Sequence, residues 1–286
     1  MIRSRITVRA TLLAAILASQ GAHAEPDAWN AEQAPFKVYG NTWYVGTHGL
    51  SSVLITSPAG HILIDGASPK SPAQIARHIR QLGFKLEDIR YILTSHEHFD
   101  HAGGIAELQR LTGAVVLGSV HSEPVLRSGK PSKGDPQYEN DMPPMAPIAN
   151  TRVVRDGEVV KLGPLALSAH YTPGHTQGGI SWTWRETEGG KSAAMVYADS
   201  LTALGAGSFR YSGNKVYPQA RADIEASIGK VAGFQCDILI SAHPEYSGLW
   251  ERKQRGNFID PEACRAYADK GRARLRETLA AEAKGG

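Results

Sequence analysis

The feature that most constrains this chain is a group of three histidines and one aspartate within six residues. The group, H-E-H-F-D-H at 96–101, directly follows a short apolar run, Tyr91–Leu93, which is typical of a buried strand. Imidazole nitrogen is the commonest side-chain metal ligand, and a carboxylate adds a hard oxygen. Chance would produce such a pattern in roughly one sequence of this kind per thousand. The group therefore predicts a metal site at the end of a strand.

Two further histidines occupy comparable positions. His175 lies in the turn T-P-G-H-T, after the strand-like run Leu165–Tyr171. His243 follows a second such run, Asp237–Ser241. Three separate strand ends thus carry histidine, and sheet-based α/β folds build their sites at this rim.

The number of candidate ligands decides between metal roles. Five histidines and one aspartate are too many for one tetrahedral ion, but they give two ions three ligands each. A closed structural zinc site uses four ligands, so three leave room for water and substrate. Two metals that share a hydroxide suit hydrolysis, and nitrogen-rich ligation favours Zn²⁺. The alternative is a set of loop histidines that only form hydrogen bonds.

Strand-like and helix-like segments alternate along both halves of the chain, which predicts mixed α/β layering. Strands are expected at 42–45, 52–56, 61–64, 91–93, 114–117, 165–171, 179–183, 194–197 and 237–241. Helices are expected after Pro69, around Ile105, around Ile224 and from Pro261 to Ala281. Residues 127–150 contain five prolines and little periodicity, so we expect a long surface loop there.

The first 24 residues have the composition of a secretory signal peptide. Three arginines precede an apolar run, Ala10–Ala18, and A-H-A at 22–24 fits a cleavage site. The alternative is an uncleaved anchor. Removing the three arginines leaves 28 basic against 28 acidic residues, which gives no electrostatic case for binding nucleic acid or a membrane. We expect an exported, periplasmic protein with one domain at 25–286. No exposed apolar stripe demands an oligomer, so we expect a monomer.

Export changes how the two cysteines are interpreted. In an oxidising compartment Cys236 and Cys264 can pair, although two buried free thiols are the alternative.

The histidine motif and the later strand ends resemble the metallo-β-lactamase superfamily, over roughly Trp43 to Ala281. Subclasses B1 and B2 have a cysteine ligand where this chain has Ser200, and His101 then takes the vacant role, as in subclass B3. Three flanking stretches are also similar to subclass B3, at 41–46, 178–184 and 196–201. The resemblance implies an α/β fold, a four-layer αβ/βα sandwich of two packed mixed β-sheets flanked by helices.

The resemblance also implies roles for individual residues. Two zinc ions would be held by two triads, His96, His98 and His175 for the first ion and Asp100, His101 and His243 for the second. Asp100 would also orient the zinc-bound hydroxide. Ser200 and Thr202 match positions that contact the carboxylate of the antibiotic or a bound water. The pair Cys236/Cys264 sits where subclass B3 enzymes have a disulfide.

The implied activity is hydrolysis of the β-lactam amide of penicillins, cephalosporins and carbapenems through a metal-bound bridging hydroxide. One rival is a thioesterase or lactonase of the glyoxalase II type, in which an aspartate bridges both metals; Asp199 lies in the right neighbourhood. The other rival is a periplasmic zinc-binding protein without turnover. Three protein ligands per ion argue against it, because such a protein would favour closed coordination.

Overall fold

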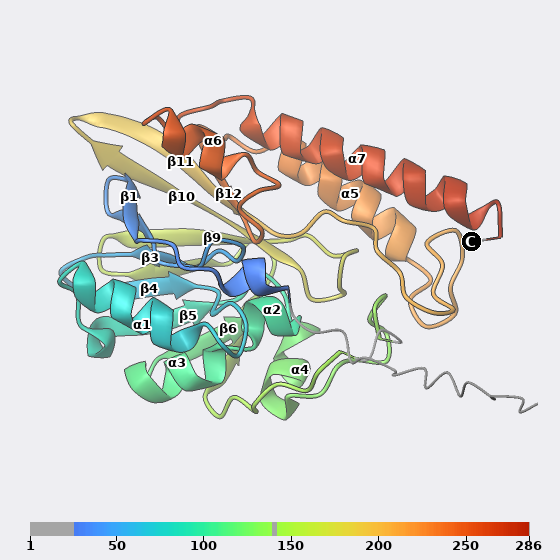
Figure 1. Ribbon diagram of the computed structural model, residues 1–286, viewed down its shortest axis with the longest axis horizontal. Coiled ribbons are helices and arrows are strands. Elements are labelled where there is room, and N and C mark those ends of the chain that lie inside the picture. The colour runs from blue at the N-terminus through green and yellow to red at the C-terminus, as the bar shows by residue number, and fades with distance from the viewer. Residues whose placement is uncertain (1–25, 139–141, 286) are drawn as a thin grey trace, which may run out of the picture.

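The structure is a computed structural model that describes residues 26–138 and 142–285. The expected signal peptide, 1–24, lies outside these residues. Two β-sheets pack face to face, with helices on both outer faces (Figure 1). This is the expected four-layer αβ/βα sandwich. In the described part of the chain, no helix has both the length and the apolarity that a bilayer span requires.

The first sheet has seven strands in chain order. They are β1 (Phe36–Tyr39), β2 (Thr42–Tyr44), β3 (Val53–Ile55), β4 (His61–Ile64), β5 (Ile89–Leu93), β6 (Val115–Gly118) and β7 (Thr151–Val153). Strands β1 to β4 pair antiparallel, whereas β4 to β7 pair parallel. The inner parallel strand β4 is buried along its whole length because both of its faces are covered, whereas the edge strand β7 is largely exposed.

The second sheet has five strands in the order β12-β11-β10-β9-β8. Their bounds are β8 (Val159–Leu162), β9 (Leu165–Tyr171), β10 (Ile180–Glu188), β11 (Lys191–Ala198) and β12 (Ile238–Ser241). All pairs are antiparallel except β11 with β12.

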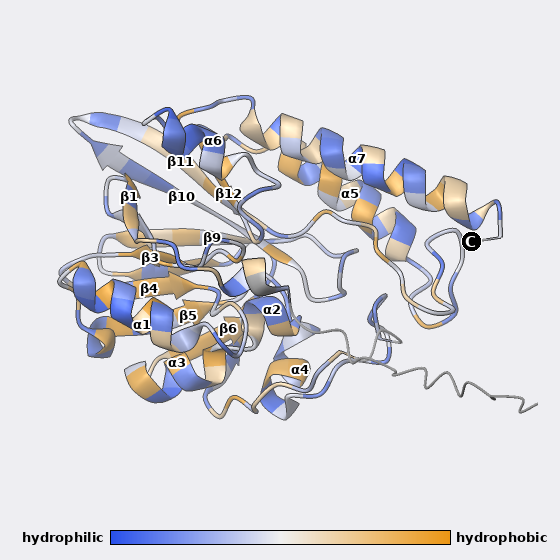
Figure 2. Cartoon of the chain, in the orientation of Figure 1, coloured by the Kyte–Doolittle hydropathy of each residue, from blue (hydrophilic) through white to orange (hydrophobic). Residues whose placement is uncertain are grey.

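Helices cover the outer face of each sheet. The first sheet is covered by α1 (Pro72–Gln81), α3 (Ile105–Thr112) and α4 (Ser122–Ser128), and the second by α5 (Ala220–Ala232) and α7 (Ala263–Glu282). Short helices η1 (Asp27–Asn30), η2 (Leu86–Asp88), α2 (Phe99–Ala102) and α6 (Leu249–Gln254) complete the described fold. Hydrophobic and hydrophilic residues alternate along the helices (Figure 2), and the buried hydrophobic ones pack with residues of the sheets.

Three apolar clusters fill the spaces between the four layers. The central cluster joins the two sheets and contains the fully buried Trp182 on β10. The indole Nε1 of Trp182 donates to the carbonyl of Thr94, 3.0 Å away. The second sheet is therefore bonded to the segment that leads from β5 into the histidine motif.

The cysteine pair is a disulfide between Cys236, which precedes β12, and Cys264 in the first turn of α7. It fastens the start of the longest helix to the edge of the second sheet.

Sequence patterns missed several elements and shortened others. Strand β10 extends to Glu188, beyond the expected 179–183, and β11 begins at Lys191, before the expected 194–197. The two-residue turn between them is Gly189-Gly190, and both glycines have positive φ, at 57° and 78°. A diglycine of this kind favours a tight hairpin, so the charged ends of the two strands still pair although they lack an apolar pattern.

Candidate metal centre

The histidine motif begins where β5 ends. The turn before it is held by Asp65, whose buried carboxylate accepts hydrogen bonds from Ser95 N (2.7 Å), Ser95 Oγ (2.6 Å) and the Tyr197 hydroxyl (2.8 Å). Asp65 has a φ of 59°, which is uncommon for a residue other than glycine and persists only where the surroundings fix it. Asp65 thus fixes the entry of the chain into the motif.

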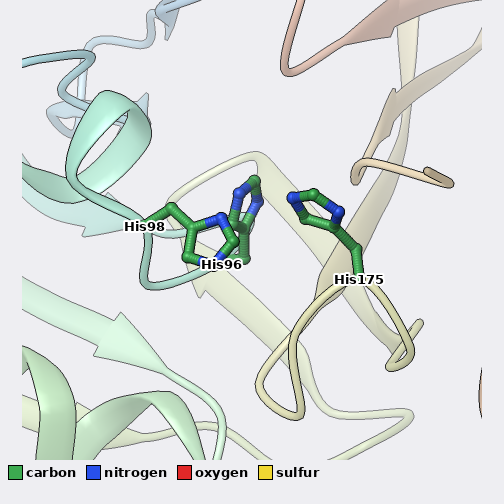
Figure 3. Close-up of side chains that lie close together, drawn as sticks. All are labelled: His96, His98 and His175. Carbon is green, nitrogen blue, oxygen red and sulfur yellow. The ribbon is translucent and has the colours of Figure 1, made fainter. Parts of the chain in front are cut away.

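The structure brings the first predicted triad together. The rings of His96, His98 and His175 lie at 4.9 Å from one another by all three centroid distances. One nitrogen of each ring lies within 4.8 Å of a nitrogen of the other two, so the three could hold one metal ion. Figure 3 shows His175 facing the other two rings from a separate turn of the chain.

Each ring of this triad has an acceptor on its outer nitrogen. Nδ1 of His96 lies 2.8 Å from Asp199 Oδ1, and Nε2 of His98 lies 2.8 Å from Asp135 Oδ2. Nδ1 of His175 lies 2.9 Å from the carbonyl of Thr202.

An acceptor on one nitrogen fixes the ring proton there and leaves the other nitrogen as a lone-pair donor, which is how metal-bound histidines are held. The inner nitrogen of His96, Nε2, is buried and has no hydrogen-bond partner. An orphaned nitrogen of this kind fits a metal ion, because a buried polar atom without a partner is otherwise costly.

The electrostatics of the triad also suit a metal. Burial, followed by the nearby His101, holds the pKa of His96 well below its usual range, and burial lowers the pKa of His175 to about 3. Both rings are therefore neutral, which ligation requires. Burial also lowers the pKa of His98, but the Asp135 carboxylate outweighs it and raises the value to about 9. Metal binding to His98 would therefore release a proton.

The second predicted triad forms a group beside the first. Asp100 Oδ2 lies 3.1 Å from His101 Nε2 and 3.4 Å from His243 Nε2, and these two nitrogens are 3.2 Å apart. Burial raises the pKa of Asp100, but His101 and His243 outweigh it and hold it well below its usual range. The carboxylate is thus ionised. His96, Asp100 and His101 also lie within 4.8 Å of one another, so the two groups share a border.

The two hydroxyl residues both follow β11, and Thr202 contacts the first triad. Ser200 is buried directly after β11, and Thr202 is half-buried. Thr202 Oγ1 lies 3.0 Å from His175 Nδ1, on the same side as the Thr202 carbonyl. Thr202 therefore supports a ring of the triad, a contact that its sequence position did not indicate.

Asp199, the candidate bridging carboxylate of the thioesterase rival, lies behind His96. Asp199 is fully buried, and its Oδ1 bonds the ring nitrogen on the outer side of His96. The carboxylate in this position contacts His96 through the nitrogen opposite the orphaned Nε2, and would support this one ligand.

An N-terminal arm, residues 26–32, reaches the second group without a covalent link. Asn30 Oδ1 accepts from Ser68 and Ser71, and Arg77 forms two hydrogen bonds to Glu32 at 2.6 and 2.7 Å. These contacts place the Trp29 ring 5.6 Å from the ring of His243.

Two loops border the first triad, one that contains Asp135 and one that contains Thr202. A hydrogen bond joins them. The backbone N–H of Ala206 donates to the carbonyl of Pro136 at 2.9 Å. Between the loops lies a cavity of about 470 Å³, lined among others by Lys133, Asp135, Tyr138 and Phe209.

Sequence reasoning missed Asp135. It lies in the expected surface loop 127–150, more than 30 positions from the histidine that it contacts. A carboxylate in a proline-rich loop gives no signal of its own, because its partner is set by how the loop folds back.

Comparison with known proteins agrees with this geometry. Residues 45–188 match the model of the metallo-beta-lactamase superfamily, and the chain belongs to this superfamily. Two solved structures narrow the resemblance to subclass B3. MEM-A1, a subclass B3 metallo-beta-lactamase from a soil metagenome library, is 66% identical with a TM-score of 0.89, over 90% of this chain and all of that one. SMB-1, a metallo-beta-lactamase, is 49% identical with a TM-score of 0.86, over 89% of this chain and 99% of that one.

Curated relatives give a more distant similarity. A hydroxyacylglutathione hydrolase of Anaeromyxobacter dehalogenans is 31% identical over 68% of this chain. The chain spans only 61% of the length of that relative.

Proposed function

We propose that this protein is a zinc-dependent β-lactamase that hydrolyses the β-lactam amide of penicillins, cephalosporins and carbapenems. The observation that carries the proposal is the pair of adjoining triads at one rim of the fold. In the first triad the buried Nε2 of His96 has no hydrogen-bond partner, and in the second the Nε2 atoms of His101 and His243 lie 3.2 Å apart. The 66% identity to a subclass B3 metallo-beta-lactamase supports the substrate class.

The first zinc ion would be held by His96, His98 and His175, and the second by Asp100, His101 and His243. Bound zinc supplies Lewis acidity, which polarises the amide carbonyl and acidifies the attacking water. Asp100 lies where the two triads meet and, being ionised, would orient that water.

Ser200 and Thr202 would bind the carboxylate of the substrate, because hydroxyl groups donate hydrogen bonds to an anion. Both follow the last residue of β11, Ala198, and Thr202 contacts His175 of the first triad. The cavity between the two loops would accept the side chain of the antibiotic.

A thioesterase of the glyoxalase II type is the second candidate, because the hydroxyacylglutathione hydrolases are detectable relatives. The position of Asp199 argues against it. The carboxylate is bonded to the outer nitrogen of His96, whereas that class needs it between the metals.

Export to the periplasm through cleavage of residues 1–24, with a monomer of 25–286 as the mature form, completes the proposal. The disulfide Cys236–Cys264 supports an oxidising compartment.

The proposal is tested with purified mature protein on three substrates: a chromogenic cephalosporin, a carbapenem and a glutathione thioester. We expect turnover of both β-lactams, its loss after treatment with a chelator and its return with added zinc. Elemental analysis should give two zinc ions per chain.

Other outcomes would contradict specific parts of the proposal. Turnover of the thioester alone would assign the chain to the thioesterase class. β-Lactam turnover that persists in metal-free protein would refute the metal mechanism, and one tightly held ion would refute the two-ion site.

A further inference from the structure

The carboxylate of Asp135 is fully committed. It is 4% exposed, and its two oxygens have different partners: Oδ1 accepts from the backbone N–H of Gln137 at 2.7 Å, and Oδ2 accepts from His98 Nε2 at 2.8 Å. The backbone of Asp135 is also held: its N–H donates to the Ser132 carbonyl at 3.0 Å, and its carbonyl accepts from the Tyr138 N–H at 3.1 Å. The loop is therefore fixed on both sides of Asp135.

His98, the partner of Asp135, differs from the other two histidines of the first triad in which ring nitrogen bonds its acceptor. His96 and His175 bond their acceptors through Nδ1, whereas His98 bonds through Nε2. His98 must then ligate through Nδ1. A neutral imidazole carries one proton, so the acceptor on Nε2 decides whether Nδ1 is free for a metal.

We propose that Asp135 is a positioning residue of the metal centre, which holds the His98 proton on Nε2 and directs Nδ1 at the ion. The inference rests on the zinc site of the proposed function and adds a residue from the loop 127–150 to it. Because the Pro136 carbonyl accepts from the Ala206 N–H, this contact also links the loop that contains Ala206 to the metal ligands.

The tautomer argument predicts an unusual order of effects for two variants. In Asp135→Asn, the Gln137 N–H donates to the amide oxygen, and the amide NH₂ then faces His98 Nε2. If the amide is turned around, its NH₂ faces the Gln137 N–H instead. Either way two donors oppose each other. In Asp135→Ala no donor faces the ring, so His98 remains free to adopt the ligating tautomer.

Zinc affinity is measured by competition with a chromogenic chelator. We expect Asp135→Asn to weaken one zinc site by about 10- to 100-fold, the range typical of lost outer-shell partners, and Asp135→Ala to weaken it less. A merely structural role predicts the reverse order, because asparagine preserves the shape of the side chain and alanine does not.

Glu97→Gln is the matched control. Glu97 is a buried carboxylate next to His98 in the chain, but its side chain accepts a hydrogen bond from the Thr176 hydroxyl at 3.1 Å. Glu97→Gln replaces a buried carboxylate by an amide of the same shape, as Asp135→Asn does. Its effect should stay within about threefold, since it leaves every ring proton in place.

A second readout follows the ring proton directly. In protein labelled with ¹⁵N-histidine and saturated with zinc, the hydrogen-bonded Nε2–H of His98 should give a protected signal that both Asp135 variants lose. Thermal melting of the saturated variants confirms that they are folded.

The proposal is overturned if alanine lowers zinc affinity as much as asparagine does, if both variants bind zinc as the parent protein does, or if the signal survives in them. None of these readouts uses β-lactam hydrolysis, so failure here is separate from failure of the proposed function.

Discussion

Buried histidines in this protein divide according to whether both ring nitrogens are used. His78 on α1 is fully buried, but its Nδ1 contacts the Val45 carbonyl at 2.9 Å and its Nε2 contacts Glu32 at 3.3 Å. His96 is equally buried, yet its Nε2 has no partner. The sequence shows both residues only as histidines, so this difference becomes visible when the acceptors are placed.

Gly179 allows the Asp199 carboxylate to reach His96. A Cβ at this position would lie 2.2 Å from Asp199 Oδ2 and 2.5 Å from the Thr172 carbonyl. We expect Gly179→Ala to displace Asp199, to lower zinc affinity by about tenfold or more, and to destabilise the fold by about 1–3 kcal/mol. Chelator competition and urea unfolding measure the two effects.

Gly213→Ala is the comparison variant for Gly179→Ala. A Cβ at Gly213 meets no atom within 4 Å, and its φ is not in the left-handed region. Zinc affinity and stability should stay near those of the parent. Equal losses in the two variants would show that added bulk, and not contact with Asp199, is responsible.

At the scale of elements, the strands that carry the site could be predicted and the segments that support it could not. β5 and β12 are short, mostly apolar runs, and β9 alternates between buried and more exposed residues; each is followed within four residues by a site histidine, so periodicity and punctuation identify them. Helix α4 and the contact of Asp135 depend on how residues 119–136 fold back, which no local period records.

The disulfide links two elements, β12 and α7, across 28 positions. In the chain-entropy model, closing such a loop stabilises the fold by about 3–4 kcal/mol. We expect the double variant Cys236→Ser/Cys264→Ser to lose about this much free energy of unfolding in urea titrations. A strong reductant should lower the free energy of unfolding of the parent toward that of the variant, and it should leave the variant unchanged. A variant as stable as the parent would contradict the expectation.

At the scale of the whole molecule, the candidate ligands come from both sheets. His96, His98 and His101 follow β5 of the first sheet, whereas His175 and His243 follow strands β9 and β12 of the second. Each proposed ion therefore joins the two halves of the sandwich.

Metal removal should consequently lower global stability. A ligand that binds the folded state alone stabilises it by about 2.7 kcal/mol at a concentration 100 times its dissociation constant. We expect the melting temperature to fall on treatment with a chelator and to rise again with added zinc. Calorimetry should show one transition shifting as a whole, and a melting temperature insensitive to metal would contradict the two-sheet bridge.

The backbone bond from Ala206 to Pro136 has a consequence for how this enzyme can change. We expect substitutions in one loop to shift the other, so that their effects on antibiotic preference do not simply add. Adaptation to a new drug would then proceed through paired changes, and the order in which they arise would decide which routes are open.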